Sequence, residues 1–221
     1  MGAFEAVLTF LGSSLCHQLD ERSFFIDGFQ MPLCARCLGL HLAFLVSAAM
    51  IMTRRDSRLS GLPPARSMVA LGVLMIPAMA DVILSYLDVV DSDNTRRVVT
   101  GALFGAALAF VLVPFVRSLL AGGPPRGTSM TTVSHLAMLA GAFSVATALA
   151  LLSESSEPLF YAVAAAGIVG MFATFFGLVL LLTLLLTDER RWAETLRLTV
   201  AAAATPLMLV LLALLHGAAL D

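Results

Sequence analysis

Long uncharged apolar stretches constrain the fold of this chain more than any other feature of its sequence. Several reach the roughly 20 residues that a helix needs to cross about 30 Å of hydrocarbon, and short polar segments separate them. The mean hydropathy is +0.95, and 59% of the 221 residues are apolar while only 13% are charged. These values lie far from those of a water-soluble domain. We therefore predict an integral membrane protein.

The spanning elements are predicted to be α-helices. Strands of a membrane barrel alternate in hydrophobicity with period two, whereas these stretches are continuously apolar and rich in Ala, Leu and Val. The fold class expected is all-α, a polytopic transmembrane bundle with a short interfacial helix before it. Gly101 and Gly105 have the GxxxG spacing typical of close helix packing. The six predicted spans cover residues 33–52, 68–90, 98–120, 133–152, 159–186 and 198–220.

The domain organisation expected is an N-terminal segment, 1–32, followed by one transmembrane domain, 33–221. Arginine placement predicts the orientation, because positively charged loops remain cytoplasmic. The alternate loops contain mostly acidic residues, so 1–32 is predicted on the extracytoplasmic side of a prokaryotic inner membrane. The net charge of -2 argues against a nucleic-acid partner and leaves the lipid bilayer as the expected one. The predicted cytoplasmic arginines are Arg54, Arg55, Arg58, Arg66, Arg117, Arg126, Arg190, Arg191 and Arg197.

All three cysteines lie within the first 37 residues, next to histidines. Pro32 suits the first turn of a helix, which puts Cys34 near a helix N-terminus, where the helix dipole favours a thiolate. At about 100° per residue, Cys34, Cys37 and His41 share one helix face, and Arg36 points the opposite way. The residues predicted to form one site are Cys16, His17, Cys34 and Cys37, with His41 as a secondary ligand.

Three interpretations of this cluster remain open. A CxxC pair joined by another Cys and His from a second segment is typical of a tetrahedral zinc or iron site. The same pair can cycle between dithiol and disulfide, with Cys34 attacking and a membrane electron carrier as partner. A static disulfide, or cysteines that serve only as small apolar residues, is the third interpretation.

Asp81 is a further candidate, because a carboxylate inside a span is costly and usually pairs within the bundle. We expect it about 13 Å from the outer end of its helix, at a depth similar to that of His41. Arg97, at the start of the next span, could neutralise Asp81 or grip an anionic group. Asp81 together with Pro77 also raises the hypothesis of a transporter or ion pathway. His216 is an additional candidate ligand near the outer end of the last span.

Three motifs, CHQ (16–18), RSF (22–24) and PLCARCLG (32–39), resemble those of a family of small prokaryotic membrane proteins, domain of unknown function 2085. NTRRVVTG (94–101), with Asp81 before it, resembles a second signature of this family. The resemblance covers roughly the first half of the chain and implies no established activity. It implies that the motif residues belong together. His41 departs from the family pattern, which has an aromatic residue there, and this ranks it below the other four ligands.

Overall fold

The computed structural model describes residues 2–53, 63–120, 132–187 and 194–220 of the chain. In these ranges the structure is all-α, with six helices long and apolar enough to cross a membrane and a short apolar helix before them. The predicted fold class and the predicted number of spanning helices are therefore confirmed. The helices are α1 (Ala3–Gly12), α2 (Ala35–Thr53), α3 (Ala65–Tyr86), α4 (Asn94–Leu120), α5 (Thr132–Leu151), α6 (Glu157–Leu186) and α7 (Glu194–Leu220).

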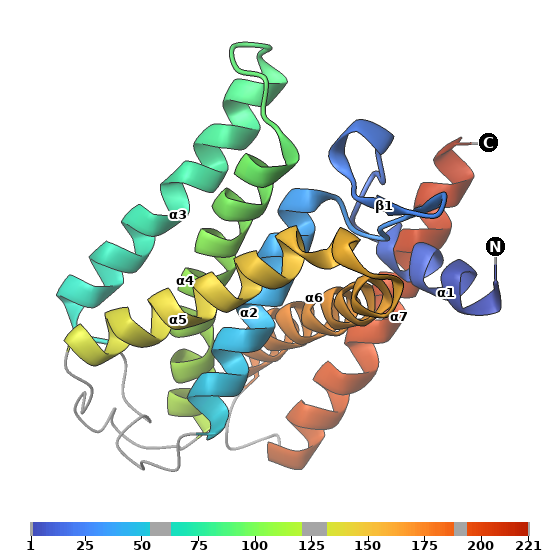
Figure 1. Cartoon of the computed structure of the whole chain (residues 1–221). Coiled ribbons are helices and arrows are strands. Elements are labelled where there is room, and N and C mark those ends of the chain that lie inside the picture. Colours follow the sequence, from blue (N-terminus) through green and yellow to red (C-terminus); the bar gives the residue numbers. More distant parts are fainter. Residues whose placement is uncertain (1, 54–62, 121–131, 188–193, 221) are drawn as a thin grey trace.

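Helices α2 and α4 form the centre of the molecule and pack closely on each other (Figure 1). About 56% of the most apolar stretch of α2 and 61% of that of α4 is buried within the protein. A Cβ atom added at Gly105 would collide with the carbonyl oxygen of Leu40, and one at Gly101 with that of Arg36. The GxxxG spacing therefore serves close helix packing, as the sequence predicts, because only glycine allows the two backbones to approach so far.

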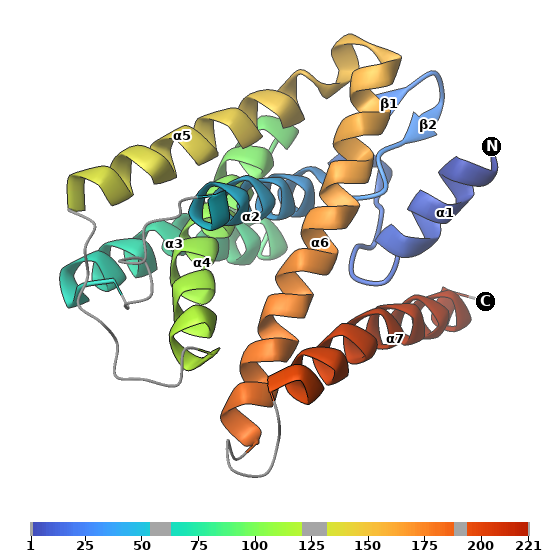
Figure 2. The same cartoon turned by 90° about the horizontal axis from the view of Figure 1, so that it is seen from below.

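The other helices surround this pair and expose more of their surface. Helix α3 packs on α4, and α5 packs on both α2 and α4. The 30-residue helix α6 contacts α2 and α4 and separates them from α7 (Figure 2). Only 22% of the apolar stretch of α7 is buried, and its Leu207 and Leu211 are exposed. Such surfaces face lipid in a membrane protein, where apolar exposure carries no penalty.

Two connections lie at the same end of the molecule (Figure 1). One joins α3 to α4, and the other joins α1 to α2 and contains Cys16. Arg66, Arg117 and Arg197 lie on helices near the opposite end, where Arg117 Nη1 lies 3.5 Å from the carbonyl oxygen of Ile51. These three arginines lie away from the cysteines, as the predicted topology requires, whereas Arg22, Arg36 and Arg97 lie beside them. The other six arginines of that prediction lie outside the described residues.

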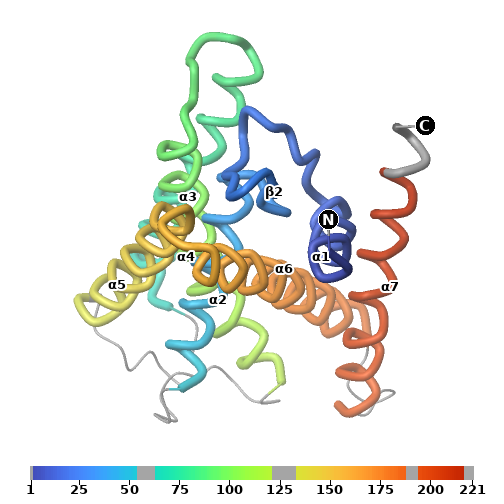
Figure 3. Tube along the Cα trace, turned by 45° about the vertical axis from the view of Figure 1, so that its right-hand side comes forward, coloured from blue at the N-terminus to red at the C-terminus, as the bar shows by residue number. Residues whose placement is uncertain are grey.

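Between α1 and α2 the chain forms a compact cap beside the start of α2 (Figure 3). The 3₁₀ turn η1 (Asp20–Arg22) is followed by a short hairpin of β1 (Phe25–Ile26) and β2 (Phe29–Gln30). Asp27 and Gly28 adopt positive φ values of 46° and 82°, which an Asp-Gly hairpin turn requires. We did not predict this hairpin, although the Asp-Gly pair between apolar residues was a signal for it.

Candidate functional site

The three thiols form one cluster, which joins the cap to the first turn of α2. The sulfur atoms of Cys16, Cys34 and Cys37 all lie within 4.8 Å of one another, and none is in a disulfide. Cys16 is 3% exposed, and the backbone N–H of Cys34 donates a hydrogen bond to its sulfur over 3.0 Å. Among the described residues, these three are the group whose ligand atoms are close enough to hold a metal ion.

The position of Cys34 at the helix start determines its electrostatics. Its carbonyl oxygen accepts the first helical hydrogen bond, from Leu38 N–H at 2.9 Å, so it is the N-cap of α2. Hydrogen bonds from the Cys16 and Cys37 thiols hold the pKa of Cys34 far below its usual range. The same hydrogen bond with Cys34 raises the pKa of Cys16 to about 11. Cys34 is therefore the thiol of the cap that ionises first, and a thiolate is the form that binds metals or attacks disulfides.

Gln18 holds the cap against the start of α2. Its side-chain amide donates to the carbonyl oxygen of Thr9 at 2.8 Å and to that of Pro32 at 3.0 Å. Gln30 in turn donates to the backbone carbonyl of Gln18 at 2.7 Å. Gln18 itself has a φ of 49°, in the left-handed region. These bonds fix the loop that contains Cys16, which explains physically why a glutamine follows Cys16 and His17 in the CHQ motif.

The NTRRVVTG motif (94–101) binds the chain around the RSF motif (22–24) through backbone carbonyls. Asn94 Nδ2 donates to the carbonyl oxygen of Ser23 at 3.2 Å, and Arg97 Nη1 donates to that of Glu21 at 3.1 Å. The two donors lie one turn apart on α4, so both face the cap. The structure thus joins the motif at 94–101 to the motif at 22–24, as the resemblance implies.

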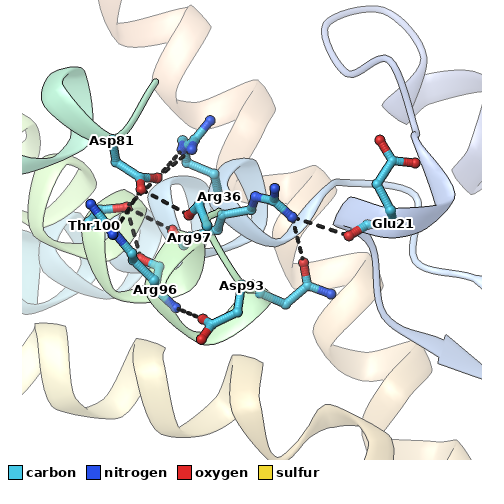
Figure 4. Close-up of polar contacts among 9 residues, drawn as sticks. Glu21, Arg36, Asp81, Asp93, Arg96, Arg97 and Thr100 are labelled. Carbon is cyan, nitrogen blue, oxygen red and sulfur yellow. Dashed lines mark hydrogen bonds and ion pairs between the residues drawn. The ribbon is translucent and has the colours of Figure 1, made fainter. Parts of the chain in front are cut away.

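Asp81 is the centre of a polar network between α2, α3 and α4 (Figure 4). It is 1% exposed and pairs with the guanidinium of Arg36, whose Nε lies 3.2 Å from Oδ2. Arg96 Nε lies 2.9 Å from Oδ1, and the Ser92 hydroxyl donates to the same oxygen at 2.8 Å. The Thr100 hydroxyl lies 3.5 Å from Oδ2. The carboxylate is therefore fully paired, which removes the main argument for an ion pathway through it.

Two expectations about Asp81 are wrong. Its charge is neutralised by Arg36 and Arg96, not by Arg97, whose guanidinium turns toward Glu21 (Figure 4). The sequence placed Arg36 on the face opposite the cysteines but could not show that Asp81 of α3 lies there. Helix α3 also ends at Tyr86 instead of residue 90, because Leu87 and the following residues form the connection to α4. Asp81 is thus about 7.5 Å from the helix end, nearer the surface than expected.

The histidines do not join the thiol cluster. The ring of His17 lies edge-on to the ring of His216, with 5.3 Å between their centroids. His41 is buried and faces α6, where its Nδ1 lies 3.2 Å from the Thr174 hydroxyl. His41 therefore lies against α6. His17 nevertheless lines the same cavity as the cysteines.

A cavity of about 340 Å³ opens beside the thiols. The three guanidinium groups on its wall come from separate elements, Arg22 from η1, Arg36 from α2 and Arg97 from α4. Among the residues that the structure describes, no Asp or Glu side chain lines it. The site thus combines soft sulfur ligands with a positively charged wall. The other lining residues are Leu15, Cys16, His17, Gln18, Leu19, Cys34, Cys37 and Tyr86.

Two archaeal proteins are similar to this chain over part of its length. An uncharacterized protein of Methanocaldococcus jannaschii is 31% identical over 102 residues, which is 46% of this chain and 64% of that protein. An uncharacterized protein of Methanothermobacter thermautotrophicus is 29% identical over 109 residues, 48% of this chain and 90% of that protein. The chain thus spans less than two thirds of the length of the first relative. No solved structure matches the chain.

The family model described as "Predicted membrane protein (DUF2085)" matches residues 16–111. This region begins at Cys16 and ends within α4. It contains the thiol cluster, Gln18, the Asp81 network and Arg97, so the matched region and the connected polar site coincide. The match of residues 16–111 to this family model confirms the resemblance predicted from the motifs.

Proposed function

We propose that this membrane protein holds one zinc or iron ion on Cys16, Cys34 and Cys37, at the extracytoplasmic face of the inner membrane. The observation that carries the proposal is the approach of the three sulfur atoms to within 4.8 Å of one another. Zn–S bonds of about 2.3 Å in a tetrahedral site put sulfur atoms roughly 3.8 Å apart. Small side-chain rotations therefore suffice to close the three thiols on one ion.

The surrounding charges support a thiolate site. Three thiolates and a divalent ion carry a net charge of about −1, which nearby cations stabilise. Arg36 lies one residue from Cys37 and lines the same cavity, and its charge lowers the pKa of Cys34. The backbone N–H that Cys34 donates to Cys16 is a further stabilising contact, because hydrogen bonds to a metal-bound sulfur hold the ligand in place.

The proposed fourth ligand is His17, which lines the cavity beside the cysteines. Its ring now contacts His216, so ligation requires a turn of the side chain. With His17 bound, the ion has four protein ligands and a structural role. With a water or substrate in that position, the ion can act as a Lewis acid. The His17→Ala variant separates the two roles: an unchanged metal affinity supports an open position, and a weakened or lost affinity supports a site closed by His17.

Elemental analysis of the full chain, purified anaerobically in mild detergent, tests the proposal. We expect about one zinc or iron per chain, and none in the variant that combines Cys34→Ser with Cys37→Ser. His135→Gln is the matched control, because this histidine lies at the opposite end of the molecule on α5 and should leave metal content unchanged. Circular dichroism of each variant verifies the fold. A folded wild-type protein without stoichiometric metal would contradict the proposal.

A thiol-disulfide oxidoreductase is the alternative, favoured by the lowered pKa of Cys34 at the start of α2. In this reaction Cys34 and Cys37 lose two electrons and two protons to a two-electron membrane carrier and form one disulfide. Thiol trapping in cells should then show both cysteines shifting between forms as the carrier is reduced or oxidised. One fixed form under both conditions rules the alternative out.

The proposed orientation can be tested with introduced cysteines. Asp91 and Arg66 are both exposed and lie near opposite ends of α3. A maleimide that cannot cross membranes should label an Asp91→Cys variant in intact cells and leave an Arg66→Cys variant unlabelled until the cells are lysed. Cys16 is a poor reporter because it is buried. The reverse labelling pattern would put the cysteine cluster on the cytoplasmic side.

A further inference from the structure

Arg97 is a buried cation without a carboxylate partner among the described residues. Arg97 is only 8% exposed and lines the cavity beside the thiols. Nη1 donates only to neutral oxygens, the Glu21 carbonyl at 3.1 Å and the Asn94 amide at 3.3 Å. Its Nε is buried and has no hydrogen-bond partner. A buried charge left in this state is costly unless an anion compensates it.

The neighbouring arginines already have partners. Arg22 lies 3.4 Å from Glu21, and Arg36 and Arg96 share Asp81. Arg97 is therefore the cation of this wall whose charge is unmatched. Desolvation by burial acts against its charged form, yet a guanidinium remains protonated in proteins. The position thus requires a negative group from outside the described contacts.

From this geometry we infer that the cavity binds a phosphate group. Arg97 lines the cavity, and its planar guanidinium carries a fork of N–H groups that suits an oxoanion held by two hydrogen bonds. Arg22, Arg36 and Arg97 approach from three elements, which suits a tetrahedral anion with oxygens in several directions better than a planar carboxylate. The absence of acidic residues from the cavity lining favours the same ligand.

Two sources can supply this chemistry, inorganic phosphate or the phosphate of a lipid headgroup. The cavity holds about 340 Å³, more than a phosphate group fills, and Leu15, Leu19 and Tyr86 on its wall offer apolar contact. It lies at the helix ends, near the expected depth of headgroups. The anion site adjoins the proposed metal position, and its existence does not depend on metal.

Thermal unfolding of the full chain in mild detergent tests the site. Millimolar inorganic phosphate, compared with chloride at equal ionic strength, should raise the melting temperature of wild type. Arg97→Gln should weaken the apparent affinity at least about tenfold, since a charge-assisted pair of bonds is lost. Arg117→Gln is the matched control, because that guanidinium lies at the other end of the molecule, and it should behave as wild type. Arg22→Gln, which removes an exposed wall cation, should weaken binding less.

Lipid nanodiscs distinguish the source. The chain is released from phosphatidylglycerol discs and examined by native mass spectrometry. If the headgroup is the ligand, the chain should retain lipid that inorganic phosphate displaces. If free phosphate is the ligand, the chain should retain no lipid. Metal content is measured on the same samples. Folded wild type that contains no stoichiometric metal as purified but binds phosphate would refute the metal proposal and leave this one intact. Two results would overturn the inference. One is wild type that binds neither phosphate nor phosphatidylglycerol. The other is an Arg97→Gln variant that loses metal but binds phosphate as wild type does, which would show that the metal-thiolate cluster is the counter-charge of Arg97.

Discussion

The polar interactions of the first half of the molecule differ in kind from those of the second half. In α2 to α4 and the cap, buried polar groups pair across distant segments, as Asp81 does with Arg36 and Gln18 with Pro32. In α6 and α7, the hydroxyls of Thr183 and Thr205 donate to backbone carbonyls four residues earlier in their own helices. The first arrangement specifies tertiary structure, and the second only satisfies a donor.

Helix packing shows the same division. The α2 and α4 backbones meet at glycines, whereas α7 exposes a row of leucines. Close packing and cross-helix hydrogen bonds are the forces that join helices in lipid, where apolar burial gives no net gain. The region matched by the family model, 16–111, contains most of the long-range side-chain hydrogen bonds among the described residues. We infer that α2, α3 and α4 form the rigid support of the site and that α7 is peripheral to it.

The largest expected effect comes from the α2 and α4 contact. Gly105→Ala forces a methyl group into the Leu40 carbonyl and should lower the free energy of unfolding by about 3 kcal/mol. Gly72→Ala in α3 is the matched control, since no atom lies within 4 Å of the added Cβ. It should gain about 0.5 to 1 kcal/mol from helix propensity. Denaturant unfolding followed by circular dichroism measures both. Equal changes in the free energy of unfolding at the two glycines would contradict the idea that the α2 and α4 contact is the tightly packed centre of the molecule.

The Asp81 network should have the next largest effect. Breaking a buried pair costs about 3 to 5 kcal/mol, but Arg36 and Arg96 are partly exposed, which reduces the cost of Asp81→Asn to about 2 kcal/mol. Asp91→Asn, in the exposed connection, should change stability by less than about 0.5 kcal/mol. The same unfolding assay applies. A neutral Asp81→Asn would mean that the network does not hold α3 to the centre.

Local features of the fold and the site could be predicted from the sequence, whereas long-range contacts could not. Apolar length predicted all six spans, because hydrocarbon thickness fixes the number of residues in a helix. Helical spacing also predicted that Cys34 and Cys37 share a face, and the cysteine clustering predicted that Cys16 joins them. The partner of Asp81 was predicted wrongly, since the identity of the helix packed opposite Arg36 is not contained in any local pattern.

The cap was the other region beyond prediction. Gln18 gave no chemical signal as a clamp, because its partners are backbone carbonyls at Thr9 and Pro32. Any residue type supplies a carbonyl, so the partners leave no pattern in the sequence. His17 shows the converse. Its place next to Cys16 favoured a ligand, yet its ring lies against His216.

The clamp should have a smaller effect on stability than the network but a specific one on the site. Gln18→Ala removes two hydrogen bonds and should cost about 1 to 2 kcal/mol. Because the loop of Cys16 is then released, metal affinity should fall while the helical circular dichroism signal is kept. Gln30→Ala, which removes one bond to the same loop, should have about half the effect on stability. Unchanged metal affinity in Gln18→Ala would show that the cap does not need the clamp.

The smallest effect is expected on α7. Leu207 is 70% exposed, so Leu207→Ala should change stability by less than about 0.5 kcal/mol in detergent. Leu38→Ala in α2, at a fully buried leucine, should cost about 2 to 5 kcal/mol and serves as the reference. A large loss of stability in Leu207→Ala would indicate that this face of α7 contacts a partner instead of lipid.

X-ray absorption at the metal edge of the anaerobically purified protein tests the central claim most directly. Three sulfur ligands at about 2.3 Å are expected for zinc, falling to two in Cys16→Ser if this variant retains the ion. Three sulfurs together with one nitrogen that disappears in His17→Ala would identify the fourth ligand. An ion surrounded only by oxygen and nitrogen, or no ion at all in folded protein, would contradict the account of Cys16, Cys34 and Cys37 as one metal site.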